Sequence, residues 1–324
     1  MKVERIQSRD REKSKSGIIK VTTCGNIIET MEMTKVNRQG SQILNLGGDA
    51  YCLKTDIDFT TGEVPEEAIK YFERSENRGD NYAGLRRSMK AVRDLINCNV
   101  TTPVNTRWLT LTYAENMTDP KKLYSDRQKF WQKVTYWHKK NGLPIPQYIC
   151  IVEPQARGAW HTHELWIYPC KAPFLPNSPE DHPIADMWGN GWITIKKLEN
   201  VDNVGAYVTA YLCDVPLEEA QAEGMDIGGM ELKDAEITAE DGTKQTKKYV
   251  KGARLHLYPS GMNFYRTSRG IKRPDVEWCI GEMAKEKVRG ATLTFSKTIR
   301  LTDDDYTNDI HYEYYNTVRG KNQE

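Results

Sequence analysis

The chain has 324 residues, with 46 lysines and arginines against 45 aspartates and glutamates, so its formal net charge is only +1. This balance excludes a uniformly basic nucleic-acid-binding protein, and any nucleic-acid affinity must come from a local basic surface. No apolar run reaches the ~20 residues of a membrane-spanning helix, and the charged N-terminus lacks the apolar stretch of a secretory signal. We therefore expect a cytoplasmic protein with no membrane contact.

The seven cysteines are scattered along the chain and include no CxxC pair. An odd, dispersed set is atypical of a disulfide framework or a structural zinc site. We expect reduced thiols, several of which fill the core.

The first hundred residues combine short β-rich runs, at residues 17–21 and 43–46, with a helical pattern between Pro65 and Asn97. The helical part carries several arginines and lysines, which form either a solvated face or a surface for DNA phosphates. We interpret residues 1–100 as an N-terminal accessory region with a basic helix.

The most regular segment follows, and it predicts strand, helix, strand, strand, short helix with strand, and helix. Capping residues support both ends of the first helix, where Asp119-Pro120 begins it and Asn141-Gly142 ends it. A short turn joins the second and third strands, which favours an antiparallel hairpin. The expected elements span residues 107–113, 120–140, 147–153, 160–168, 187–198 and 204–214, with a later strand at 253–258.

This order is that of a ferredoxin-like, RRM-like split βαβ fold of the α+β class. It predicts a central antiparallel sheet with helices on one face, which leaves the other face free for a site. We assign residues 101–275 to this core, with a charged insertion at about 215–252. Residues 276–324 form a C-terminal extension, and the N-terminal extension is expected to be helical.

Two histidines and a glutamate form the candidate metal site. His161 and His163 are two apart on a predicted strand, so both imidazoles leave the same face, roughly 6–7 Å apart. Glu153 has the same parity on the partner strand, and a register that pairs it with His161 would place the two within ~5 Å. Two neutral imidazoles and a carboxylate with open positions are typical of a catalytic metal site. A chance surface pattern is the alternative for the histidine pair alone.

Tyr207 and Tyr211 are four residues apart on a predicted helix and therefore share one face. Paired tyrosines are often half-buried core residues. Beside a metal ion, however, a phenol can attack a polarised phosphodiester and conserve its bond energy in a covalent intermediate.

Four segments, in their order along the chain, resemble the motifs of three-motif rolling-circle replication initiators. The chain is similar to the HUH endonuclease superfamily, which includes replication-associated proteins of bacterial plasmids, integrated elements and single-stranded DNA phages. The resemblance covers roughly residues 74–275, because the flanking segments at 74–97 and 264–274 also match. The four segments are WLTLTY (108–113), VEPQARGAWHTHELW (152–166), WGNGWITIKK (188–197) and NVGAYVTAYL (203–212).

The resemblance implies a role for each candidate residue. Glu153, His161 and His163 would hold a divalent Mg²⁺ or Mn²⁺ ion, and Tyr207 or Tyr211 would attack DNA, with Tyr207 favoured as the essential one. The tyrosine motif commonly reads Tyr-x-x-Lys-Tyr, whereas position 210 is alanine here. Cys213-Asp214 likewise stands where a further lysine is usual.

The implied activity is that of a metal-dependent, site-specific nicking and joining enzyme for single-stranded DNA. It would initiate rolling-circle replication through a 5′-phosphotyrosyl intermediate on origin DNA. A host DNA polymerase would extend the free 3′ end. A host helicase would unwind the duplex, because the chain has no GxxxxGK[ST] motif. The candidate phosphate contacts, which otherwise form a solubilising loop, are Arg157, Arg266, Arg269, Lys272 and Arg273.

Three alternatives stay open from the sequence. A transposase or a mobilisation relaxase could use the same scaffold on another DNA substrate. Ala210 is compatible with a non-catalytic DNA-binding regulator that has a degenerate HUH core. A small-molecule metallohydrolase would need an enclosed pocket and would leave the basic loops unexplained.

Overall fold

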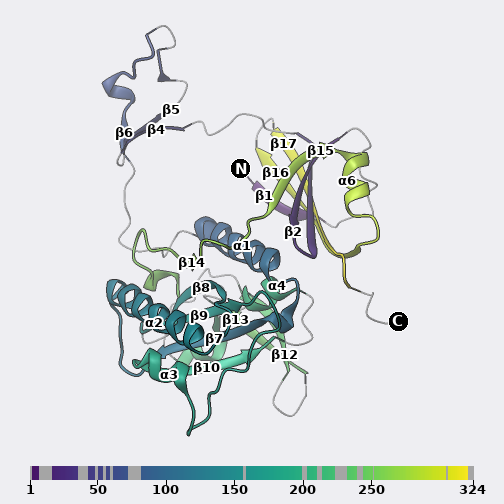
Figure 1. The fold of residues 1–324 in the computed structure, drawn as a ribbon. Helices are drawn as coiled ribbons and strands as arrows, with labels where there is room; N and C mark the ends of the chain where they lie inside the picture. Colours follow the sequence, from purple (N-terminus) through teal and green to yellow (C-terminus); the bar gives the residue numbers. More distant parts are fainter. Residues whose placement is uncertain are drawn as a thin grey trace.

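A computed structural model gives the structure of most of the chain (Figure 1). Within the described residues, no helix combines the length and apolarity needed to cross a bilayer. The described residues are 2–6, 17–35, 43–47, 50–53, 56–58, 61–71, 82–155, 158–198, 203–209, 214–222, 232–238, 244–250, 252–303 and 306–319.

A five-stranded antiparallel sheet forms the centre of the molecule, with strand order β10-β7-β9-β8-β14. It confirms the predicted α+β class and the predicted hairpin. Its strands are β7 (Thr106–Tyr113), β8 (Gln147–Pro154), β9 (Trp160–Ile167), β10 (Gly191–Lys197) and β14 (Tyr265–Thr267).

Helix α2 (Pro120–Lys140) covers one face of the central sheet, together with the short α3 (Pro183–Trp188). As predicted, the Asp119 side chain caps α2 by accepting a hydrogen bond from the Lys121 backbone N–H at 2.8 Å. Phe130 of α2 packs against Trp166 of β9 in the main core.

The expectation that helices lie on one face only is wrong. Helices α1 (Tyr82–Asn99) and α4 (Val204–Thr209) pack on the opposite face of the same sheet. The reason is that β8 and β9 carry apolar residues at both parities in their middle. Ile151 and Leu165 need a cover on this second face just as Val152 and Trp166 do on the first. The predicted site must therefore share its face with these helices.

The two ends of the chain build a second, six-stranded antiparallel sheet, which we call the accessory sheet, with order β1-β16-β17-β3-β2-β15. The N-terminal extension is thus not purely helical, because apolar β-rich runs around the turn at Gly25 form a hairpin before α1. The strands are β1 (Lys2–Ile6), β2 (Ile18–Cys24), β3 (Ile27–Met33), β15 (Asp275–Ile280), β16 (Thr292–Asp303) and β17 (Tyr306–Asn316).

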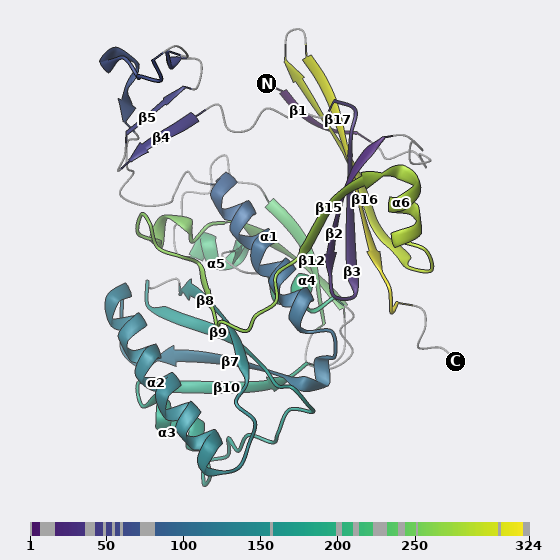
Figure 2. The same cartoon turned by 45° about the horizontal axis from the view of Figure 1, so that its top comes forward.

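Helix α6 (Gly281–Lys287) covers one face of the accessory sheet, where Ala284 packs on Ile19 and Val21. On the other side, α1 fixes this sheet to the central one. The Lys90 ammonium group lies 2.8 Å from a Glu29 carboxylate oxygen of β3 and 2.7 Å from one of Asp94. Figure 2 shows α1 between the two sheets.

Two small sheets complete the described fold. Strands β4 (Ile43–Gly47), β5 (Ala50–Leu53) and β6 (Lys70–Tyr71) form one of them. The other lies in the predicted insertion and contains β11 (Val215–Pro216), β12 (Leu232–Thr238) and β13 (Lys244–Val250), next to α5 (Leu217–Ala222).

The strand predicted at residues 253–258 is wrong. A short 3₁₀ helix (Leu255–Leu257) occupies this segment. The buried residues Leu255 and Tyr258 are three apart, so they suit a tight helical turn and not the two-residue period of a strand.

Candidate functional site

The register of the β8–β9 hairpin brings the three candidate ligands together. Glu153 pairs directly with His161, and Ile151 pairs with His163. Because strand side chains alternate, Glu153, His161 and His163 leave the same face of the sheet. The register on which the sequence argument depended is therefore confirmed.

The three side chains converge on one carboxylate oxygen. Oε2 of Glu153 lies 3.2 Å from Nε2 of His161 and 3.0 Å from Nε2 of His163. One ligand atom from each residue lies within 4.8 Å of the other two, so the group could hold a metal ion. Glu153 is buried, whereas the histidine side chains keep 14% and 16% of their surface exposed. The cluster therefore opens toward solvent through its imidazoles.

The electrostatics of the cluster favour the ligand forms of these groups. Burial alone would raise the pKa of Glu153, but hydrogen bonds from His161 and His163 hold that pKa far below its usual range. Burial lowers the pKa of His161, against the opposing effect of Glu153. An ionised carboxylate and a neutral imidazole are the states that bind a divalent cation.

Strand β7 orients the second histidine. Oγ1 of Thr110 lies 3.1 Å from Nδ1 of His163, and Trp108 contacts the same imidazole edge-on. With Nδ1–H donating to the Thr110 hydroxyl, Nε2 of His163 is the nitrogen that faces Glu153. Such a contact fixes the tautomer and the ring angle of a metal-binding histidine.

An arginine that the sequence did not single out completes the cluster. Nη1 of Arg254 lies 3.3 Å from Oε1 of Glu153, the oxygen that does not face the histidines. The Arg254 side chain is 13% exposed. The carboxylate therefore lies between a fixed positive charge and the imidazole pair.

The cross-strand row that contains Glu153 and His161 continues over the sheet through Thr112 to Trp192 of β10. Trp192 is 63% exposed, which is unusual for a tryptophan. An exposed indole on the same face as the cluster offers a flat apolar surface beside it.

Helix α4, which contains Tyr207, lies over the same face of the sheet. Val204 and Val208 of this helix share a core cluster with Ile151 and Leu165. Gly205 permits close packing on α1, because its backbone N–H donates to Oδ1 of Asn97 at 2.8 Å and a Cβ there would come within 2.5 Å of a carbonyl oxygen of α1. The Tyr207 side chain, Tyr211 and Arg157 lie outside the described residues.

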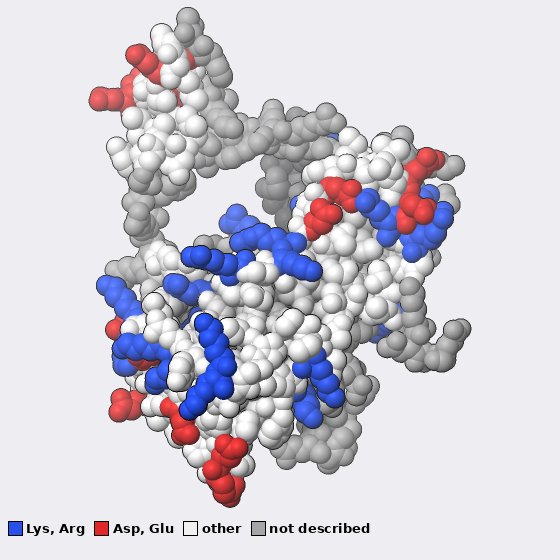
Figure 3. All heavy atoms as spheres, in the orientation of Figure 1, with Lys and Arg blue, Asp and Glu red and all other residues white. Residues whose placement is uncertain are grey.

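Four of the predicted phosphate contacts are exposed, namely Arg266, Arg269, Lys272 and Arg273. The Arg266 guanidinium lies 3.8 Å above the centre of the Tyr124 ring of α2. Figure 3 shows that lysine and arginine side chains gather over α1 and α2 on the face in view. The basic surface is thus local, as the near-zero net charge requires.

Sequence reasoning missed Thr110, Arg254 and Trp192. Strand parity could have indicated Thr110 and Trp192, once the neighbours of β9 were known. Arg254 carries no such signal, since it follows the insertion and is 101 residues from Glu153.

Comparison with known proteins agrees with the resemblance that the motifs predict. Residues 106–215 match the sequence model of a family described as replication-associated protein ORF2. This segment runs from β7 to β11 and includes Glu153, His161, His163 and Tyr207. No curated protein and no solved structure matches the chain significantly. Residues 106–215 therefore carry the sequence pattern of this replication-associated protein family, consistent with a rolling-circle replication initiator.

Proposed function

We propose that the chain nicks and rejoins single-stranded DNA at a replication origin and so initiates rolling-circle replication. The observation that carries this proposal is the convergence of Glu153, His161 and His163 on one face of the sheet, inside the segment that matches the replication-associated family. The donor set of two imidazoles and one carboxylate fits a divalent cation that keeps open positions for a substrate.

Glu153, His161 and His163 hold the cation in this proposal. A bound Mg²⁺ or Mn²⁺ ion would polarise the scissile phosphodiester and neutralise developing charge. The protein supplies an ionised Glu153, a neutral His161 and an oriented His163, so little rearrangement is needed before binding. Trp192, exposed on the same face, would stack with a base of the bound strand.

Tyr207 is the nucleophile in this proposal. Its phenolic oxygen attacks the phosphorus, the bond from phosphorus to the 3′ oxygen breaks, and the phenolic proton balances the 3′-hydroxyl that leaves. The DNA then remains attached as a 5′-phosphotyrosine, and a host polymerase extends the 3′-hydroxyl. Tyr211 carries out the second transfer that closes the displaced circle. A host helicase supplies unwinding.

Arg254 supplies the positive charge that the tyrosine motif lacks at Ala210. Its guanidinium is held beside Glu153, where a phosphate oxygen of the substrate would face the histidine cluster. Arginine suits this role because its planar fork binds phosphate through two N–H groups. The absence of a lysine at position 210 therefore does not require a non-cleaving protein.

The test is a covalent-adduct assay with the full-length chain. Single-stranded oligonucleotides tiled across the DNA that flanks its gene are incubated with Mn²⁺, and adducts are separated on denaturing gels. The wild type and the control variant Tyr136→Phe, at an exposed tyrosine of α2, should both form an adduct with one oligonucleotide. His163→Ala and Tyr207→Phe should form none, and Tyr211→Phe should keep the first cleavage.

The outcomes separate the alternatives. DNA binding without an adduct from the wild type would support a non-catalytic DNA-binding regulator. An adduct from Tyr207→Phe but not from Tyr211→Phe would reverse the roles of the two tyrosines. Cleavage only at transposon ends or at a transfer origin would indicate a transposase or a relaxase.

A further inference from the structure

One face of the accessory sheet differs from the face that α6 covers. Across five strands, the register places Trp278, Lys20, Met31, Tyr312 and Lys297 in one continuous row, from β15 at the edge of the sheet to β16. Directly opposed residues share a face, and four gaps between neighbouring strands span about 19 Å. The row therefore alternates aromatic and basic side chains over much of the sheet's width.

A second row runs parallel to the first on the same face. It contains Val276, Thr22, Glu29, Tyr314 and Phe295. The two rows together, which we call the aromatic face, thus include four aromatic side chains and two lysines. Trp278 is 51% exposed and Phe295 is 45% exposed. Large apolar side chains are rarely this accessible on a sheet face without a partner to cover them.

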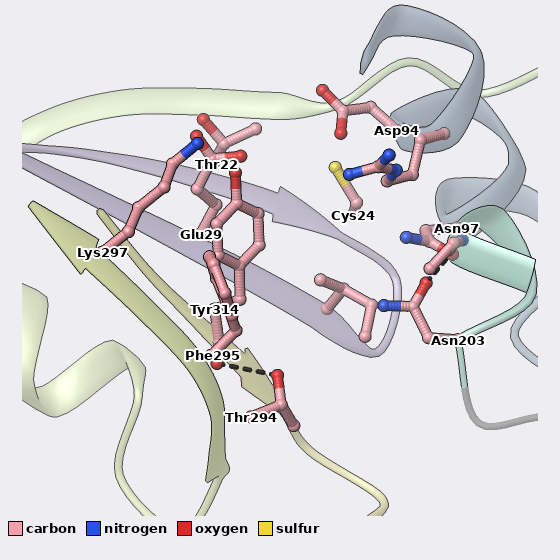
Figure 4. Close-up of a pocket in the computed structure, with 13 residues that line it drawn as sticks. Thr22, Cys24, Glu29, Asp94, Asn97, Asn203, Thr294, Phe295, Lys297 and Tyr314 are labelled. Carbon is pink, nitrogen blue, oxygen red and sulfur yellow. Dashed lines mark hydrogen bonds between the residues drawn. The ribbon is translucent and has the colours of Figure 1, made fainter. Parts of the chain in front are cut away.

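The second row ends in a cavity of about 330 Å³ between the aromatic face and the helices of the central domain. Figure 4 shows Phe295, Tyr314 and Lys297 on one side of this cavity, and Asp94, Asn97 and Asn203 on the other. Asn203 caps α4, the helix that contains Tyr207, by accepting a hydrogen bond from the Ala206 N–H at 3.0 Å. The aromatic face is therefore continuous with the helix of the proposed nucleophile.

The charge of the aromatic face suits a polyanion. Its acidic residue Glu29 is paired with Lys90 of α1, which also binds Asp94, so these carboxylates face a cation instead of solvent. Lys297 lies with its ammonium group 5.0 Å above the centre of the Tyr312 ring, which holds the charge beside an aromatic surface. Arg86 and Arg87, both exposed on α1, extend the basic character toward the central domain.

We propose that the aromatic face binds single-stranded DNA, with its bases stacked on Trp278, Tyr312, Tyr314 and Phe295 and its phosphates near Lys20 and Lys297. Aromatic side chains in a basic groove are the chemistry that binds unpaired nucleic acid without base-specific contacts. A duplex hides its bases inside the stack and cannot use these rings. The cavity, at the lower end of the volume range of small-ligand pockets, accommodates one unstacked base.

This inference rests on the proposed function, because it gives the accessory sheet the strand that leads to or from the nick. The face would hold that strand while α4 presents the tyrosine. Binding to the aromatic face needs no metal ion, whereas nicking does, so the two proposals can fail separately.

The test measures the binding of a fluorescent dT20 oligonucleotide to the full-length chain by anisotropy, in EDTA. The double variant Trp278→Ala with Phe295→Ala should bind at least about tenfold more weakly than the wild type, since stacking losses of this size are usual for each base. Both side chains are about half exposed, so the fold should survive, which circular dichroism checks. The matched control Tyr136→Ala removes an exposed aromatic ring from α2 and should leave the affinity unchanged.

Photocrosslinking locates the contact. A dT20 with one 5-iodouracil should crosslink to peptides that contain Trp278, Tyr312 or Tyr314. Wild-type affinity in the double variant, or crosslinks confined to the central domain, would overturn the proposal. A change in oligomeric state without a change in DNA affinity would also overturn it, because the face would then bind a second copy. His163→Ala should bind dT20 like the wild type even though it cannot nick, and adduct formation by His163→Ala would overturn the proposed function alone.

Discussion

Arg254 and Glu153 form an ion pair at 3.3 Å, and it uses the carboxylate oxygen that the two histidines leave aside. Arg254→Met should reduce single-turnover adduct formation about 10²-fold at saturating Mn²⁺ and DNA, because a preorganised donor to developing charge is lost. Arg254→Lys should recover part of the rate. The control Arg266→Met should keep the rate and weaken DNA binding, with a smaller salt dependence. A wild-type rate for Arg254→Met would contradict the role assigned to this arginine.

Thr110→Val tests how His163 is oriented. The substitution keeps the size of the side chain but removes the hydroxyl 3.1 Å from Nδ1 of His163. We expect Mn²⁺ affinity, measured by calorimetry, to fall about 10- to 100-fold, the usual cost of losing such a contact. Thr194→Val is the matched control, since Thr194 pairs with Thr110 across the strands but lies one strand farther from the cluster. Equal affinities for the wild type and Thr110→Val would show that the ring is oriented otherwise.

A buried ion pair on the far face of β9 should matter for stability and not for chemistry. Glu164 is completely buried, with Oε1 2.7 Å from Nε of Arg127 and Oε2 accepting from the Trp166 indole at 2.8 Å. Arg127→Met leaves this carboxylate without its cation, so urea unfolding should show a loss of about 3–5 kcal/mol. Lys122→Met, which removes an exposed ion pair of the same helix, should cost less than about 1 kcal/mol. Similar losses in both variants would refute this distinction.

His138 predicts a fall in stability at mildly acidic pH. It is completely buried between the Val134 carbonyl, 2.8 Å from Nδ1, and the Tyr168 hydroxyl, 3.0 Å from Nε2. Burial lowers its pKa in the folded state, so below pH ~6.5 the unfolded chain takes up a proton that the folded chain does not. Above that pH the group contributes no pH dependence.

The stability of the wild type should therefore fall as the pH drops below about 6.5, by at most about 1.4 kcal/mol per pH unit from this residue. Urea unfolding at pH 7.5 and pH 5.5 measures the loss. His138→Gln keeps a donor for the Val134 carbonyl but cannot titrate, so its loss between the two pH values should be smaller. An equal loss in both proteins would assign the pH dependence to other groups.

Much of the candidate site could be predicted because it depends on local rules. The two-residue period of a strand fixes the common face of His161 and His163, and a short turn places Glu153 in the partner strand. Asp119 and Asn141 likewise mark the ends of α2 from the sequence alone, because a cap depends on residues within one turn. The family resemblance then indicated what this arrangement does in related proteins.

The accessory sheet could not be predicted in the same way. Its β2–β3 hairpin pairs with β15 on one side and β17 on the other, so segments almost 300 residues apart in the sequence are neighbours. No periodicity within a segment identifies a partner at that distance. The aromatic face exists only because this pairing aligns side chains from five strands.

The sequence by itself determined the hairpin, its ligand triad and the caps of α2, because each depends on residues that are close along the chain. Only the tertiary structure decided that Arg254 meets Glu153, that helices cover both faces of the central sheet, and that the two chain ends share a second sheet. Those outcomes depend on which apolar surfaces pack together, and burial of apolar area is non-directional and leaves no local pattern to read.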